Sequence, residues 1–231
     1  MSAWEGIRAV EVEPSLYAAN FNVLGRQIDE LMAAGVRVFH YDVGDGHFIP
    51  PVTIGPIILE SIGPRIHEQG GRIDAHLMVD DPEHHFEQMR GAGADSVTFH
   101  YEAVSDVEET MARARELGLG AGVAFNPETD PEDVAECSQE ADLVLCMSIH
   151  PGYSGQPFMR EALDRIRTLR RLLPESVPIQ VDGGVDHDNA REIVEAGARL
   201  LVVGSHIFGA PDIGEAYRAI AESAAETAAT R

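Results

Sequence analysis

Residues 20–48 read NFNVLGRQIDELMAAGVRVFHYDVGDGHF and join a helical pattern to a strand pattern. In the first half, apolar residues recur at helical spacing and form a stripe along one face: Val23, Ile28, Leu31 and Met32. Gly35 follows this stripe, and glycine suits the left-handed residue that ends many helices. The next segment, Arg37–Val43, is rich in β-branched and aromatic residues. The stretch therefore predicts a helix that returns through a short loop to a buried strand.

The same order of helix, glycine and strand recurs along the chain. Three segments each end a helical pattern and precede a strand: Ala34-Gly35-Val36, Ala92-Gly93-Ala94 and Ala196-Gly197-Ala198. Further helical patterns cover residues 161–173 and 189–197. The predicted strands are Ala9–Pro14, Arg37–Val43, Ile73–Met78, Ser96–His100, Gly122–Phe125, Leu143–Ile149, Ile179–Val181 and Leu200–Val203.

Eight such βα units with right-handed crossovers and no Pro/Ser-rich linker predict an α/β fold. We expect a parallel (β/α)8 TIM barrel that forms a single domain over residues 1–231, with a C-terminal tail that frays after about residue 226. An open, doubly wound parallel sheet is the alternative. The first helix lacks a GxGxxG motif, which argues against that alternative.

Charge and composition exclude several functions. The net charge of −22 argues against nucleic acid or an anionic membrane as a partner. All 17 basic residues are arginine, which excludes a Schiff-base lysine, a pyridoxal phosphate lysine and a P-loop lysine. The first residues show no secretory signal pattern, and no apolar stretch is long enough to span a bilayer. Two cysteines, Cys137 and Cys146, suit a cytoplasmic protein.

Polar residues stand where three predicted strands end. His40 and Asp42 are two residues apart, so both side chains lie on the same face of their strand. His76 and Asp182 end two other strands, and the active site of a TIM barrel lies at this end. Two histidines and two carboxylates predict a site for Zn²⁺, Mn²⁺ or Fe²⁺.

Each of these residues, taken alone, has an alternative interpretation as a structural residue that binds no metal. A single strand-end histidine is more often a hydrogen-bonded structural residue. The four together favour a metal, because burying several ionisable groups side by side is costly without one. The remaining candidates, His47, His84 and His85, lie in polar segments and are expected at the surface, and His100 is left without a role.

Glycine-rich segments follow the last three predicted strands: Gly152-Tyr153-Ser154-Gly155, Gly183-Gly184 and Gly204-Ser205. Glycine lets the backbone approach a ligand, and loops after the last two strands of such barrels commonly bind phosphate. No arginine lies in these segments, so backbone amides and Ser205 would hold the phosphate. The alternative is that each glycine only makes a tight turn.

The chain resembles the ribulose-phosphate 3-epimerases, and the resemblance runs from Pro14-Ser15-Leu16 to Phe208-Gly209-Ala210-Pro211. The motifs that carry the resemblance are the HxDxxDGHF run at His40–Phe48, Ala75-His76-Leu77-Met78, Met147-Ser148 leading to Pro151-Gly152, and Val181-Asp182-Gly183-Gly184.

The resemblance implies a metal-dependent 3-epimerase that converts D-ribulose 5-phosphate into D-xylulose 5-phosphate through an enediolate, without an organic cofactor. It implies that His40, Asp42, His76 and Asp182 bind one divalent metal ion, and that Asp42 and Asp182 are also the two catalytic acid/base groups. It further implies that Ser15, His76, Met78 and Met147 contact the sugar, and that the three glycine segments receive the phosphate. We also expect a homo-oligomer.

Several positions depart from the family pattern: Ala18, Asn20, Gly44, Pro51 and His150. Gly44 stands where a methionine is usual, which predicts an enlarged pocket. Another ketose phosphate, such as D-allulose 6-phosphate, is therefore an alternative substrate. A barrel that only binds sugar phosphate or metal is an alternative of another class, and the paired Asp42 and Asp182 argue against it. Related decarboxylases and hexulose-phosphate synthases use a DxKxxD motif, which the absence of lysine excludes.

Overall fold

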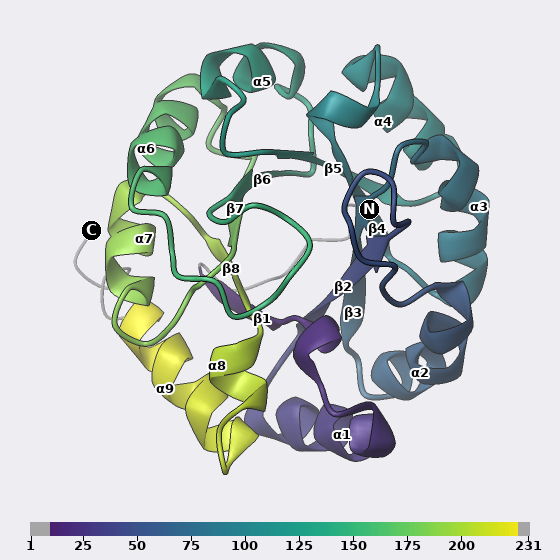
Figure 1. Ribbon diagram of the computed structural model, residues 1–231, viewed down its shortest axis with the longest axis vertical. Coiled ribbons are helices and arrows are strands. Elements are labelled where there is room, and N and C mark those ends of the chain that lie inside the picture. Colours follow the sequence, from purple (N-terminus) through teal and green to yellow (C-terminus); the bar gives the residue numbers. More distant parts are fainter. Residues whose placement is uncertain (1–9, 226–231) are drawn as a thin grey trace.

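The computed structural model describes residues 10–225, in which a ring of parallel strands is surrounded by helices (Figure 1). The strands are β1 (Glu11–Pro14), β2 (Val38–Gly44), β3 (Arg72–Met78), β4 (Ser96–His100), β5 (Gly120–Phe125), β6 (Leu143–Met147), β7 (Ile179–Asp182) and β8 (Leu200–Val203). The α-helices are α1 (Leu24–Ala34), α2 (Pro56–Glu68), α3 (Glu83–Ala92), α4 (Val107–Glu116), α5 (Pro131–Cys137), α6 (Ala162–Leu172), α7 (Ala190–Ala196), α8 (Ser205–Phe208) and α9 (Ile213–Ala225). Short 3-10 turns are η1 (Leu16–Ala18), η2 (Phe21–Val23) and η3 (Tyr101–Ala103).

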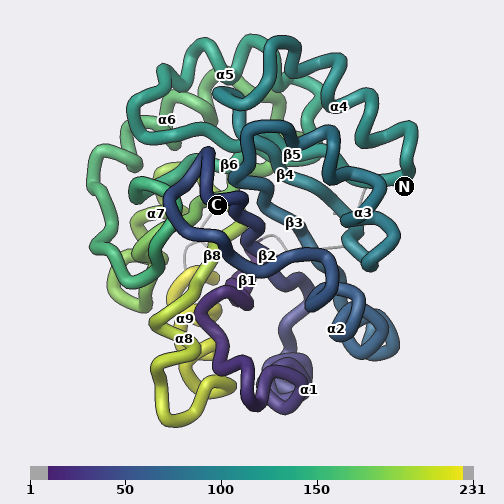
Figure 2. The backbone as a smooth tube through the Cα atoms, turned by 45° about the vertical axis from the view of Figure 1, so that its right-hand side comes forward, coloured from purple at the N-terminus to yellow at the C-terminus, as the bar shows by residue number. Residues whose placement is uncertain are grey.

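The strands form one eight-stranded parallel sheet in the order β1-β8-β7-β6-β5-β4-β3-β2. A parallel bridge between Ser15 and His40 brings the two ends of this order together, so the barrel is nearly closed. Figure 2 shows the helices on the outside, with α1 beside α9 where the first and last units meet. The predicted (β/α)8 barrel is confirmed. No helix within residues 10–225 is long and apolar enough to cross a membrane.

The predicted boundaries differ from the observed ones at a few places. The segment that begins the first predicted helix forms the turn η2, where the Asn20 side chain accepts a hydrogen bond from the N–H of Asn22. Strand β6 ends at Met147, because the carbonyl of Ser148 accepts from the N–H of Met159 in the following loop. The start of the first predicted strand at Ala9 and the tail after residue 226 lie outside the described residues.

Two packing layers follow from the alternation along the strands. Side chains such as Phe39, Tyr41 and Phe99 face outward into a continuous apolar layer beneath the helices. The apolar part of the barrel interior is smaller and consists of Val38, Ala124, Leu143, Leu145, Met147, Ile149 and Leu200. Polar residues that are also fully buried include Glu13, Asp74, Thr98 and Gln180. The outer layer therefore supplies most of the apolar burial, and the interior holds polar groups.

The expected helix ends are present. Gly35 and Gly93, which end α1 and α3, both have φ of 106°, a left-handed conformation that favours glycine. Each N–H donates back to carbonyls of the preceding turn, which satisfies groups that would otherwise lack partners. The chain then enters β2 or β4 within a few residues, so the strand ends are placed accurately.

Gly122 tests how tightly the barrel interior is packed. A Cβ at this position would lie 2.4 Å from Thr98 Oγ1 and 2.8 Å from Leu143 Cδ1. We expect Gly122→Val to lower the free energy of unfolding by about 1–3 kcal/mol through overpacking. In the control Gly91→Ala, a Cβ meets no atom within 4 Å, and helix propensity predicts an unchanged or slightly higher stability. Urea unfolding of both variants measures this, and equal stabilities would contradict a tightly packed interior.

Candidate active site

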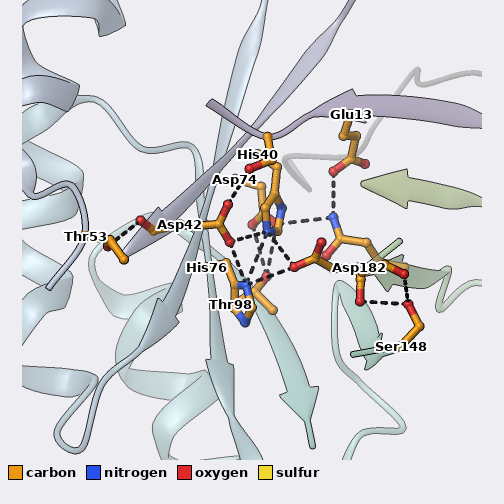
Figure 3. Close-up of polar contacts among 12 residues, drawn as sticks. Glu13, His40, Asp42, Thr53, Asp74, His76, Thr98, Ser148 and Asp182 are labelled. Atoms are coloured by element: carbon orange, nitrogen blue, oxygen red, sulfur yellow. Dashed lines mark hydrogen bonds and ion pairs between the residues drawn. The ribbon is translucent and has the colours of Figure 1, made fainter. Parts of the chain in front are cut away.

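Four ionisable side chains meet at the carboxyl ends of β2, β3 and β7 (Figure 3). His40 Nε2 lies 3.3 Å from Asp42 Oδ1 and 3.3 Å from His76 Nδ1. His76 Nδ1 lies 3.2 Å from Asp42 Oδ1 and 3.8 Å from Asp182 Oδ2. In Figure 3, Asp42 and Asp182 lie on either side of the two histidines. The residues expected from the strand ends therefore occupy one cluster.

The spacing of these atoms fits a metal ion. One atom from each side chain can be chosen so that all four lie within 4.8 Å of one another. Ligands of a tetrahedral zinc ion are about 3.4 Å apart, given metal–ligand distances of roughly 2.0–2.1 Å. The separations that involve a histidine are 3.2–4.0 Å and bracket this value. Two nitrogens and two carboxylate oxygens are donors that Zn²⁺, Mn²⁺ and Fe²⁺ accept.

Neighbouring groups hold Asp42 in place. Its Oδ2 accepts a hydrogen bond of 2.6 Å from the hydroxyl of Ser15, which leaves Oδ1 directed at the histidines. The Thr53 hydroxyl donates to the carbonyl of Asp42 at 2.8 Å and accepts from the N–H of Gly44 at 2.6 Å. Both the side chain and the backbone of Asp42 are thus fixed before any ligand binds.

Asp74, which the sequence did not point to as a site residue, lies behind His40. His40 Nδ1 lies 3.6 Å from Asp74 Oδ2, and both side chains are completely buried. Asp74 also accepts hydrogen bonds from the hydroxyls of Ser96 at 2.7 Å and Thr98 at 3.0 Å. A carboxylate behind the outer nitrogen of a ligand histidine is a common arrangement at metal sites. The signal in the sequence was the position of Asp74, two residues before His76 on the same face of β3.

The two site carboxyls differ in pKa. Burial raises the pKa of Asp182 to about 7, and the negative charge of Asp42 adds to this rise. Burial also acts to raise the pKa of Asp42, but the charge of His40 and hydrogen bonds from His40 and His76 lower it well below its ordinary value. One carboxyl therefore holds its proton far more readily than the other, which suits a pair that exchanges protons with a substrate.

A pocket opens beside this cluster. Its lining includes nearly all the residues expected to contact the sugar phosphate: Ser15, Met78, Met147, Gly152, Tyr153, Ser154, Gly155, Asp182, Gly183, Gly184, Gly204 and Ser205. The exception is His76, which has no exposed surface. Tyr17, Ile149, Val185 and His206 also line the pocket, and no pattern in the sequence pointed to them. The two aspartates of the cluster and the glycine segments thus line one cavity.

Two of the glycine positions require glycine. Gly183 and Gly184 have φ of 123° and 66°, and a Cβ on Gly184 would lie 2.4 Å from the backbone nitrogen of Phe158. The hydroxyl of Ser148 lies within hydrogen-bond distance of the carbonyls of Asp182 and Gly183, at 2.8 and 2.7 Å. The turn after β7 is therefore held against the loop after β6, with backbone exposed to the pocket.

A known protein family matches most of the chain. The profile of the Ribulose-phosphate 3 epimerase family matches residues 11–208. The chain belongs to this family. It is therefore an isomerase of the carbohydrate epimerase type.

Named relatives lie within the same family. The ribulose-phosphate 3-epimerase of Escherichia coli strain K12 is 40% identical over 204 residues, which cover 87% of this chain and 90% of the relative. That of Bacillus subtilis is 37% identical over 207 residues, which cover 88% and 94%. The solved 3-hexulose-6-phosphate synthase of Salmonella typhimurium is similar in fold, with a TM-score of 0.72, 20% identity and coverage of 94% and 99%.

Four further histidines differ in burial. His47 and His84 are exposed, as expected, and His85 is partly exposed. His100 is completely buried and contacts His76, with 2.9 Å between their Nε2 atoms. Burial lowers the pKa of His100 to about 4. His100 therefore belongs with the site and not with the surface.

The prediction that Gly44 enlarges the pocket assumed open space beside this glycine, and that assumption was wrong. A Cβ on Gly44 would lie 2.5 Å from Cδ1 of Ile49 and 3.1 Å from the carbonyl oxygen of Pro51. Ile49 is buried, and both Ile49 and Pro51 contact the loop after β6 beside Gly152. The space next to Gly44 is therefore filled by the loop after β2 and not left open.

Substitutions at positions 44 and 49, alone and combined, test this packing. Gly44→Met alone should lower the free energy of unfolding by about 1–3 kcal/mol, because the new side chain collides with Ile49. Gly44→Met combined with Ile49→Ala should recover part of that loss, since the isoleucine is removed. Thermal unfolding of the single and double variants measures the coupling, and strictly additive effects would contradict it.

Proposed function

We propose that this protein is a metal-dependent 3-epimerase that interconverts D-ribulose 5-phosphate and D-xylulose 5-phosphate. The observation that carries the proposal is the placement of Asp42 and Asp182 on either side of His40 and His76, at one end of a pocket lined by glycine loops. Membership of the family and the names of its relatives support the same substrate.

Asp42 and Asp182 are proposed as the acid/base pair. A proton on carbon 3, beside the ketone, is only weakly acidic, so its removal needs a base and stabilisation of the enediolate that forms. One carboxylate accepts this proton on one face of the sugar, and the other carboxyl delivers a proton to the opposite face, which inverts the centre. His40, Asp42, His76 and Asp182 would hold a divalent ion, which when bound would supply electrostatic stabilisation of the negative charge on the sugar oxygens.

The other pocket residues are proposed to position the substrate. Met78 and Met147 are buried apolar side chains that line the pocket beside the two aspartates, and they exclude water from the reacting carbon. The backbone of the turns at Gly183-Gly184 and Gly204-Ser205, with the Ser205 hydroxyl, receives the phosphate. His206 lines the same pocket and offers a ring N–H that can donate a hydrogen bond to the phosphate.

The aspartates are tested by proton exchange. We expect Asp42→Asn and Asp182→Asn each to lower the rate of deuterium incorporation at carbon 3, in D₂O with D-ribulose 5-phosphate, by at least about 10²–10⁴-fold. The control Asp188→Asn changes an exposed carboxylate after β7 that does not line the pocket, and should exchange at the normal rate. A folded, metal-loaded variant at position 42 or 182 with full exchange would remove that residue from the acid/base role.

The same exchange assay identifies which sugar phosphate is the preferred substrate. D-allulose 6-phosphate, supplied beside the pentulose phosphate, should exchange more slowly, and faster exchange with the hexulose would transfer the assignment to it. An absence of exchange with both sugars in metal-loaded protein would favour a barrel that only binds.

Metal removal tests the cation. Protein treated with a strong chelator and then freed of it should lose exchange activity and regain it when Zn²⁺, Mn²⁺ or Fe²⁺ is added. The melting temperature should also fall on metal removal, because a ligand that binds only the folded state stabilises it. Full activity in protein shown to be metal-free would contradict the metal assignment.

A further inference from the structure

His100 is the last residue of β4 and lies behind the cluster described above. Its ring is fully buried between two others. The His76 ring is nearly parallel to it, with centroids 5.1 Å apart and an interplanar angle of 20°, and Phe48 from the loop after β2 lies on it with centroids 4.7 Å apart. The proposed reaction does not use His100, so its burial there has another cause.

A line of polar contacts runs from His76 to the loop after β5. His76 Nε2 lies 2.9 Å from His100 Nε2, and His100 Nδ1 lies 3.2 Å from Oε2 of Glu102. The other oxygen of Glu102 accepts the N–H of Asn126 at 2.8 Å and the hydroxyl of Thr129. Each oxygen of Glu102 thus receives a donor, and the carboxylate is held in one orientation.

The two ends of this line require the same arrangement of protons. His76 Nδ1 faces Asp42, Asp182 and His40, and as a metal ligand it carries no proton, so the proton of His76 resides on Nε2 and is donated to His100. His100 then accepts at Nε2 and carries its own proton on Nδ1. A carboxylate only accepts hydrogen bonds, so Glu102 requires that same proton on His100 Nδ1. The network assigns a single tautomer to both rings.

We propose that His100 and Glu102 are positioning residues of the metal centre, which hold His76 in the tautomer that presents an unprotonated Nδ1 to the ion. The inference rests on the metal centre of the proposed function. Under this inference, each of the two ligand histidines has a carboxylate on the side away from the ion. His40 presents Nε2 to the ion, and Asp74 lies next to its Nδ1. His76 presents Nδ1, and its Nε2 contacts His100, which in turn contacts Glu102.

Variants of His100 separate this role from simple packing. His100→Leu removes the acceptor and leaves the N–H of His76 buried without a partner. We expect its dissociation constant for Zn²⁺ or Co²⁺ to rise about 10–100-fold. His100→Gln offers a carbonyl to His76 and an amide N–H to Glu102, and should recover most of the affinity. Competition with a chelator on the purified full-length protein, without substrate, measures this affinity. The visible spectrum of the Co²⁺-loaded protein reports the ligand geometry.

A neighbouring residue provides the matched control. Phe99 precedes His100 on β4 but faces the outer layer, where it packs against Phe86 with ring centroids 6.3 Å apart. Phe99→Leu should lower the melting temperature without changing the metal dissociation constant. Glu102→Ala is a second test of the inference, because this side chain is 24% exposed and its removal does not open the core. It should weaken metal binding in the same direction as His100→Leu.

Three results would overturn the inference: wild-type affinity with an unchanged Co²⁺ spectrum in His100→Leu, an affinity in His100→Gln as weak as in His100→Leu, or wild-type affinity in Glu102→Ala. These measurements need no turnover. Any of these results would leave the epimerase proposal intact, since the aspartate variants and proton exchange test that proposal separately.

Discussion

Two carboxylates and two imidazoles lie within 4.8 Å of one another in a region where His40 and His76 have no surface exposed to solvent. Burying charged groups so close together is costly unless opposite charge and hydrogen bonds compensate for the lost water. Three members of the cluster have polar neighbours on their outer side: the Ser15 hydroxyl donates to Asp42, the Asp74 carboxylate lies 3.6 Å from His40 Nδ1, and His100 contacts His76. A bound divalent ion of the kind proposed would supply the remaining compensation.

The need for partners to buried charged groups extends into the barrel below the site. Asp74 lies between His40 and the hydroxyls of Ser96 and Thr98, and Gln180 donates to Glu13 at 2.6 Å. Burial, together with the charge of Asp74, raises the pKa of Glu13 well above its ordinary value, which favours a neutral Glu13. The interior therefore holds polar groups next to the site residues in place of apolar packing, and the apolar layer beneath the helices supplies most of the burial that stabilises the fold.

The loop after β2 shows how one motif serves both chemistry and folding. His40 and Asp42 reach the site, but Asp45 in the same run accepts the N–H groups of His47 and Phe48 and, at 2.9 Å, that of Asp80. This carboxylate shapes the loop and ties it to the end of β3. The same loop supplies Ile49 beside Gly44 and Phe48 over His100, so it covers the site from two directions.

The order of strands and helices, the pairing of His40 with Asp42 on one face, and the glycine turns at Gly183-Gly184 were determined by the sequence itself. Each depends on local periodicity or on backbone conformations that glycine favours, and both are properties of neighbouring residues. Only the tertiary structure decided that His100 meets His76, 24 residues away, that Asp74 lies behind His40, and that Ile49 fills the space beside Gly44. These contacts depend on strand register and barrel closure, which follow from the packing of the whole chain. Alternation along β3 places Asp74 on the same face as His76, but it does not show which side chain of another strand Asp74 meets.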